Sequence, residues 1–112
     1  EWQFEGDEED VPLFWVKPGS DELTFTLHGE LDLDGEATLT KLPIPHFAPG
    51  AVIVLDLSEL TFVDSSGMRA LVLLRRRVNE RIGHVLLRKP QANVLRVLRV
   101  AGLDQVFHID CR

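Results

Sequence analysis

Two neighbouring segments constrain the fold of this 112-residue chain most strongly: a continuous apolar run and the amphipathic stretch after it. The run, residues 51–57 (AVIVLDL), is rich in β-branched side chains and predicts a strand buried on both faces of a sheet. From Met68 to Ile82, apolar residues recur every three or four positions, which is typical of a helix with one buried face. The positions that we expect on the buried face are Leu71, Leu74, Val78 and Ile82. We expect one strand-helix unit, with Gly83 closing the helix.

The alternation of strand and helix continues downstream. Residues 84–87 (HVLL) predict a second buried strand, and Pro90 marks the first turn of another helix that ends at Gly102. The buried positions that we expect on that helix are Val94, Leu95, Leu98 and Ala101. Residues 105–109 (QVFHI) predict a final strand.

Upstream, the pattern changes to a hairpin and a short helix. Residues 13–16 and 23–29 predict two strands joined by the turn signal KPGSD. The segment after Gly29 predicts one short helix, which Pro43 and Pro45 end. The whole chain then reads β-β-α-β-α-β-α-β. This order predicts an α/β fold: a mixed, mostly parallel sheet of about four or five strands, an antiparallel N-terminal strand and about three or four helices.

Charge divides the chain unevenly. The net charge is −6, and residues 1–10 (EWQFEGDEED) hold six acids and no base. We interpret this run as a solvated acidic tail and residues 11–112 as the folded domain. Residues 11–64 hold nine acids and two bases, whereas residues 65–112 hold three acids and ten bases. Such asymmetry affects the choice of partner rather than the fold.

Several function classes find little support in the residues. The single cysteine, Cys111, excludes an internal disulfide, and neither a bilayer-spanning stretch nor a signal peptide is present, so we expect a cytoplasmic protein. No nucleotide-binding loop, nucleophile elbow or metalloprotease motif occurs, so we expect no enzyme and no cofactor. His108 and Cys111 are too few ligands for a structural metal site. The arginines of residues 65–100 lack interleaved aromatics, so we expect no direct binding of nucleic acid.

The tetrapeptide Asp64-Ser65-Ser66-Gly67 stands between the apolar run and the basic helix. Asp and Ser are common at helix N-termini, so capping alone is one interpretation. The other is a functional serine, because binding sites gather at the carboxyl ends of parallel strands and a helix N-terminus accommodates an anion. The physical pattern leaves both interpretations open.

The segment LDLSELTFVDSSGMRALVLL, with GELDLDGEATL before it and PQANVLRVLRVAGLDQVF after it, resembles the STAS domain family. The likeness covers roughly residues 11–110 and is nearest to bacterial anti-sigma factor antagonists. The resemblance implies a partner switch: the unphosphorylated domain binds an anti-sigma factor that is also a serine kinase, and a sigma factor is released. A serine phosphatase reverses the phosphorylation. The implied acceptor is Ser65, and the implied partner-binding residues are Asp32, Asp64, Ser65, Ser66, Gly67, Met68 and Arg69.

Two alternatives remain open at this stage. The chain could be a regulatory STAS domain of a larger transporter, lipid-transport or stress-sensing protein. It could also be a receiver that accepts a phosphoryl group on Asp56 or Asp64, although no paired acids follow its first strand. One departure from the family pattern is the segment with Gly35, Pro43 and Pro45, which should shorten the first helix.

Overall fold

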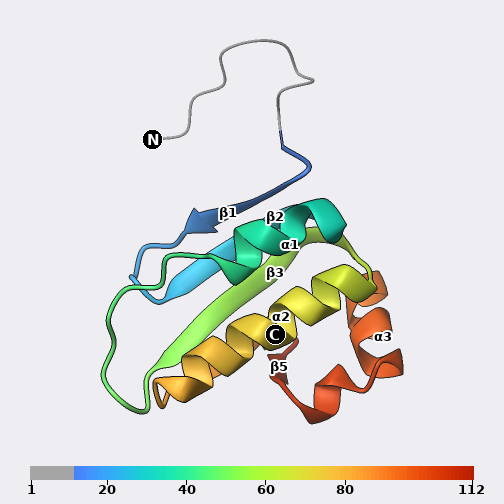
Figure 1. The fold of residues 1–112 in the computed structure, drawn as a ribbon. Helices are drawn as coiled ribbons and strands as arrows, with labels where there is room; N and C mark the ends of the chain where they lie inside the picture. The colour runs from blue at the N-terminus through green and yellow to red at the C-terminus, as the bar shows by residue number, and fades with distance from the viewer. Residues whose placement is uncertain (1–11) are drawn as a thin grey trace.

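The computed structural model describes residues 12–112, and the predicted acidic tail at 1–10 lies outside them. The elements, in chain order, are β1 (Phe14–Pro18), β2 (Thr24–Leu31), α1 (Leu33–Thr40), β3 (Val52–Val63), α2 (Ser65–Glu80), β4 (His84–Arg88), α3 (Ala92–Val100), the 3-10 helix η2 (Leu103–Gln105) and β5 (His108–Asp110). Figure 1 shows how they follow one another.

The five strands form one sheet in the order β1-β2-β3-β4-β5. β1 is antiparallel to β2, and every other neighbouring pair is parallel. The predicted fold class is confirmed, because consecutive parallel strands require the helical crossovers that the sequence pattern indicated. The parallel arrangement also brings the carboxyl ends of β2 and β3 to the same rim of the sheet, where α1 and α2 begin.

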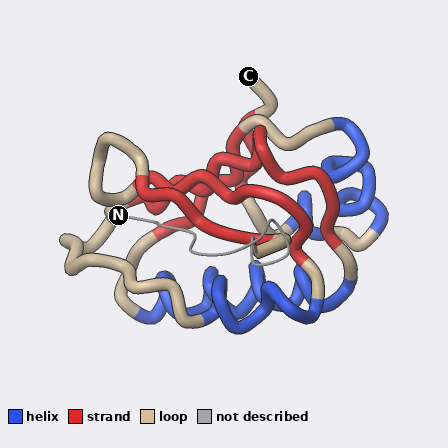
Figure 2. The backbone as a smooth tube through the Cα atoms, turned by 90° about the horizontal axis from the view of Figure 1, so that it is seen from above, coloured by secondary structure: helices blue, strands red, loops and turns tan. Residues whose placement is uncertain are grey.

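Helices α1 and α2 lie together along one face of the sheet, and α3 lies beside the carboxyl end of β3 (Figure 1 and Figure 2). Burial along β3 reflects this arrangement, because Ile53, Leu55 and Leu57 are buried whereas Val52 is 44% exposed. The prediction that residues 51–57 are buried on both faces was therefore wrong. Helices cover only one face, so alternate side chains of the strand remain partly open to solvent.

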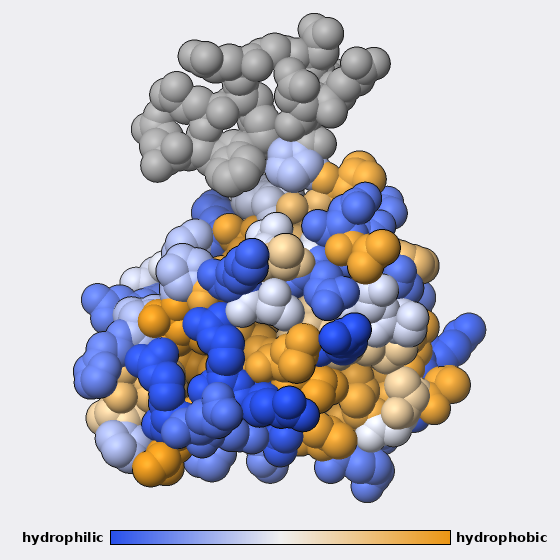
Figure 3. Space-filling view, viewed as in Figure 1, coloured by the Kyte–Doolittle hydropathy of each residue, from blue (hydrophilic) through white to orange (hydrophobic). Residues whose placement is uncertain are grey.

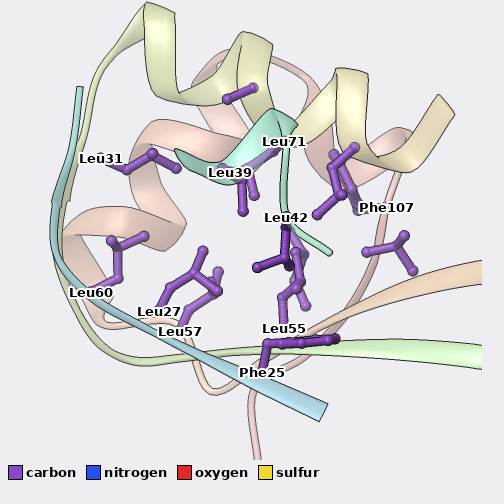
Figure 4. Close-up of a cluster of buried hydrophobic side chains, with 14 of the residues drawn as sticks. Phe25, Leu27, Leu31, Leu39, Leu42, Leu55, Leu57, Leu60, Leu71 and Phe107 are labelled. Atoms are coloured by element: carbon purple, nitrogen blue, oxygen red, sulfur yellow. The ribbon is translucent and has the colours of Figure 1, made fainter. Parts of the chain in front are cut away.

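The core fills the space between that face and the helices (Figure 4). Its side chains are almost all leucine, valine, isoleucine and phenylalanine, and no polar or charged residue among 12–112 is fully buried. The labelled members come from every layer: Phe25, Leu27, Leu31, Leu39, Leu42, Leu55, Leu57, Leu60, Leu71 and Phe107. A core of this kind is rigid enough to fix the helix positions at the rim.

β3 is longer than predicted and runs to Val63. Two register shifts against β2, at Thr26/His28 and at Gly29/Glu30, let the polar segment after Leu57 keep pairing. The period-two signal is lost at such irregularities, which is why the sequence pattern ended the strand early. As a result, Asp64 follows the strand directly instead of standing a few residues beyond it.

α2 also begins earlier than predicted, at Ser65, and ends at Glu80. The left-handed residue that ends it is Ile82 (φ 60°), which is 65% exposed, so its predicted place in the buried stripe was wrong. Gly83 still closes the helix, because its amide donates to the carbonyl oxygen of Val78 at 3.0 Å, and it also serves packing, since a Cβ there would stand 2.6 Å from the Phe47 ring. The predicted core positions Leu71, Leu74 and Val78 are confirmed.

The short first helix is confirmed as α1, but its buried residues are Gly35 and Leu39. Leu33 is 70% exposed. A Cβ on Gly35 would stand 3.0 Å from the Phe14 ring, so glycine lets α1 pack closely on β1. At the other end of α1, Arg77 donates hydrogen bonds to the carbonyl oxygens of residues 40 and 42.

The C-terminal elements differ from the prediction in detail. α3 begins at Ala92 rather than at Pro90, and of its expected stripe only Val94 and Leu98 are buried. Residues 103–105 form η2, so the last strand is β5 and not residues 105–109. The side-chain amides of Gln91 and Asn93 donate to the carbonyl oxygens of residues 58 and 61 in β3, both at 2.8 Å. These bonds hold the start of α3 beside the part of β3 that extends beyond its pairing with β4.

Candidate functional site

The predicted site lies on the rim where β2 and β3 end. Leu31 and Val63 are paired in register as the last residues of these strands. Each strand is followed at once by an aspartate, and the amide of Asp64 donates to the carbonyl oxygen of Leu31 at 3.3 Å. The N-termini of α1 and α2 therefore stand side by side, with Asp32 and Asp64 as their N-cap residues.

Asp64 and Gly67 have structural roles. The carboxylate of Asp64 accepts a hydrogen bond from the Gly67 amide at 3.0 Å, which satisfies one of the free donors of the first turn. Gly67 is buried against the end of β2, and a Cβ there would overlap the carbonyl oxygen of Leu31. Only glycine allows α2 to begin this close to the sheet. The capping interpretation is thus correct for the aspartate.

The two serines differ from these residues and from each other. Ser65 is exposed, whereas Ser66 is partly buried. No hydrogen bond joins the Ser65 side chain to another residue of the part that the structure describes. The hydroxyl of Ser65 therefore faces solvent at the first position of a 16-residue helix. It stands between Asp64 and Gly67, which the N-cap and the close packing require. Capping does not explain why a serine stands there.

The other predicted site residues surround Ser65 with different degrees of exposure. Asp32 caps α1 and accepts a hydrogen bond from the amide of Asp34 at 3.0 Å. Met68 is partly buried and packs against the core, and Arg69 is exposed. The structure thus brings all seven predicted residues to one rim, from two helix starts that are separated in the chain.

Three exposed apolar side chains near the rim were not predicted. Leu33 is 70% exposed, Leu13 is 64% exposed and Phe62 is 45% exposed. Leu13 and Phe62 both lie next to Glu30, one through a backbone hydrogen bond and one through strand pairing. In the sequence they are only apolar residues like many others, so only the fold could reveal that they are exposed near this rim.

The rim is acidic around Ser65, and the site is open. Asp32 and Asp64 are the cap residues, and Asp34 follows within the first turn of α1. A hollow of about 220 Å³ adjoins this end of α1 and is lined in part by Leu13, Asp32 and Gly35. A group attached to Ser65 would therefore stand near the negative charge of the two cap residues.

Asp56, the other acid considered for phosphoryl acceptance, is held elsewhere on the sheet. Burial alone would raise its pKa, but hydrogen bonds from Ser58 and Arg88 outweigh burial and lower the pKa of this carboxyl. The Arg88 guanidinium lies 3.2 Å from the carboxylate oxygen. These contacts explain Asp56 as a structural ion pair, so it does not compete with Ser65 as the candidate site.

Neither a metal-binding cluster nor a membrane-spanning helix occurs among the described residues. Within residues 12–112, no three side chains of His, Cys, Asp or Glu gather closely enough to hold a metal ion. None of the helices in this part of the chain combines the length and apolar character needed to cross a bilayer.

The arrangement defines a mixed α/β domain with an exposed serine at a strand-to-helix junction. Residues 15–111 match the STAS domain, and the chain belongs to this family. Among curated proteins, the anti-sigma-B factor antagonist of Bacillus subtilis is 22% identical over 97 residues, which cover 87% of this chain and 89% of that protein.

Solved structures support the fold independently. A candidate anti-sigma factor antagonist from Thermotoga maritima has a TM-score of 0.66 at 23% identity, over 87% of this chain and 85% of that one. The anti-sigma factor antagonist SpoIIAA, in its unphosphorylated form, has a TM-score of 0.55 at 18% identity, over 83% and 96% of the two chains. At these identities the likeness establishes the common fold.

Proposed function

We propose that this chain is an anti-sigma factor antagonist whose unphosphorylated form binds an anti-sigma factor with serine kinase activity and so releases a sigma factor. The observation that carries the proposal is Ser65, an exposed serine without a structural role between the cap Asp64 and the buried Gly67. Two relatives named as anti-sigma factor antagonists support it, and the structure of one of them, SpoIIAA, is that of its unphosphorylated form.

The chemistry of the switch requires one nucleophile from this chain. The Ser65 hydroxyl attacks the γ-phosphorus of ATP bound to the partner kinase, so a serine Oγ–P bond forms. The bond between that phosphorus and the β–γ bridging oxygen breaks, ADP leaves, and a base of the kinase takes the hydroxyl proton. A serine phosphatase reverses the step by hydrolysis of the phosphate ester to serine and inorganic phosphate. The chain itself acts as a binding domain, in the cytoplasm where ATP is available.

Phosphorylation weakens docking for a physical reason that the rim supplies. A phosphoserine adds about 1.5–2 negative charges at neutral pH. In the free domain, water solvates these charges because Ser65 is exposed. In the docked complex, they would lose that water while facing Asp32 and Asp64, whose carboxylates are held by the helix amides. Phosphorylation therefore weakens binding to the partner, while the fold is little affected.

The docking surface in this proposal joins the two helix starts. Asp32, Ser65, Ser66 and Arg69 supply polar contacts. Leu33 and Phe62 add exposed apolar area near the same rim, and a partner can cover a small serine hydroxyl without leaving a void. Docking to a protein surface also explains why these leucine and phenylalanine side chains remain outside the core.

The test compares two serines that differ only in exposure. The full chain and its variants Ser65→Ala and Ser66→Ala are used to capture partners from the source cell, and each is incubated with the recovered kinase and radiolabelled ATP. We expect all three to bind, the wild type and Ser66→Ala to be labelled, and Ser65→Ala to remain unlabelled. Stoichiometric labelling of Ser65→Ala would show that the acceptor is another residue. Recovery of no anti-sigma factor by any of the three would refute the proposed function.

A further inference from the structure

The arginines of α2 and its C-cap divide into two groups. Three of the five have partners within the chain. Arg77 donates to two carbonyl oxygens at the end of α1, at 2.6 and 2.9 Å. The guanidinium of Arg81 lies 4.4 Å from the centroid of the Phe47 ring, and that of Arg75 lies 5.9 Å from the centroid of Phe107. These three side chains hold α2 to the rest of the domain.

Arg69 and Arg76 have no such role. Both are exposed, and the ion pair of Arg88 with Asp56 is the only one within 4.0 Å in the described part of the chain. With Ser65 they occupy positions i, i+4 and i+11, which share one face of a helix. At a rise of 1.5 Å per residue, they stand about 6 and about 16 Å from Ser65 along the axis. We name this face of α2, with Ser65, Arg69 and Arg76, the arginine stripe.

The stripe carries positive charge that its own helix does not balance. The first turn of α2 contains no acid, and the helix has a single acid, Glu80, at its last position. In Figure 3, strongly hydrophilic side chains gather over the region that the C-terminal half of α2 occupies in Figure 1. The opposite helix face is buried through Ala70, Leu71 and Leu74, so the arginines point away from the core.

We infer that the arginine stripe docks an acidic surface of the anti-sigma factor and thereby extends the contact around Ser65 along α2. The inference rests on the proposed function and adds the chemistry of the partner. Charge complementarity indicates an acidic partner surface, because two unpaired guanidinium groups about 10 Å apart can bind two carboxylates or a run of acidic side chains. Contacts of this kind set association rate and partner choice more than final affinity.

The stripe also connects docking to the switch. Ser65 and Arg69 are one turn apart, with the position that receives negative charge on the N-terminal side, which is the favourable order for an i,i+4 ion pair. A phosphate on Ser65 therefore forms an ion pair with Arg69 on the exposed surface of the same helix. The guanidinium is then no longer available to the acidic partner, so phosphorylation removes one attractive contact as well as adding repulsion.

Binding kinetics test the inference with a matched pair of variants. Arg69→Gln/Arg76→Gln removes the stripe, and Arg96→Gln/Arg99→Gln removes the same charge from the exposed face of α3. Association with the recovered anti-sigma factor is measured at several salt concentrations. We expect the stripe variant to associate about five- to tenfold more slowly at low salt and with a weaker salt dependence, and the α3 variant to differ from wild type by less than about twofold. Equal effects of the two variants would overturn the inference while leaving the proposed function intact.

A second measurement is independent of the anti-sigma factor. The full chain is titrated with an oligoglutamate peptide, and the arginine Nε–Hε resonances are followed by NMR. We expect the largest shifts at Arg69 and Arg76, and a smaller shift at Arg69 when residue 65 is phosphoserine. Larger shifts on α3 would overturn the inference. So would shifts on the stripe that occur only after the six acids of residues 1–10 are replaced by amides, because the occupant would then be this chain's own N-terminal segment.

Discussion

Gly67→Ala is the most informative single change in the rim, because it adds one methyl group at the point where α2 meets the sheet. The new Cβ would stand 2.8 Å from Leu31 Cγ and from Val63 Cγ2, and it would overlap the carbonyl oxygen of Leu31. Carbon atoms in favourable contact are about 3.5–4.0 Å apart. The helix start must therefore move outward by several tenths of an ångström or more.

The cost can be worked from two opposing effects. Overpacking of a well-packed site costs about 1–3 kcal/mol, and the upper part of this range applies because one of the atoms met is a backbone oxygen in the central pair of strands. Alanine in place of glycine favours the helix by about 1 kcal/mol. We therefore expect a net loss of about 2 kcal/mol in the free energy of unfolding.

Urea denaturation measures this loss, with Ser66→Ala as the control from the same turn. Ser66→Ala should change the free energy of unfolding by less than about 0.5 kcal/mol, because it removes a partly buried hydroxyl and adds no atom. Kinase labelling of Gly67→Ala should also be slower than that of the control, since the displaced turn carries Ser65. Wild-type stability of Gly67→Ala would refute the close approach on which the description of the rim depends.

Three further changes test the contacts that support the site. Asp64→Ala removes the N-cap of α2 and should cost about 1 kcal/mol in urea denaturation, with binding reduced in parallel. Arg77→Met removes two charge-assisted hydrogen bonds to the end of α1 and should cost about 2–3 kcal/mol in thermal or urea unfolding, whereas Arg76→Met should cost less than about 0.5 kcal/mol. Asp56 has a folded pKa below its unfolded value, so it contributes stability above the ordinary pKa of 3.8 that is lost as the pH falls through the folded pKa. Stability measured as a function of pH should therefore fall less steeply in that acidic window for Asp56→Asn than for wild type.

Much of the fold could be predicted because its elements are local patterns. The strand in residues 51–57 and the helical spacing of Leu71, Leu74 and Val78 are each visible within one segment, and both elements are confirmed, although only one face of the strand is buried. The errors in the predicted ends and buried positions occur where contacts with another segment, or the turn of the chain, determine the structure. β3 continues to Val63 through register shifts against β2, and Ile82 leaves the buried stripe because the chain turns there with a positive φ.

The site shows the same division. Asp64 as a cap follows from residue preference, and its hydrogen bond to the Gly67 amide confirms the interpretation. The need for glycine at 67 depends on Leu31, which is 36 positions earlier in the chain, so no local pattern could reveal it. The exposure of Leu33 likewise depends on how α1 packs against β1. The role of Ser65 as phosphoacceptor stays a prediction.

The dissociation constant for the anti-sigma factor, measured with serine and then with phosphoserine at position 65 of the otherwise identical full chain, tests the central claim most directly. If the rim acts as a switch, phosphorylation should weaken binding by about 100-fold or more, which corresponds to about 2.7 kcal/mol. Circular dichroism of the two forms should be the same, because Ser65 has no structural partner. Dissociation constants that agree within about twofold would contradict the account.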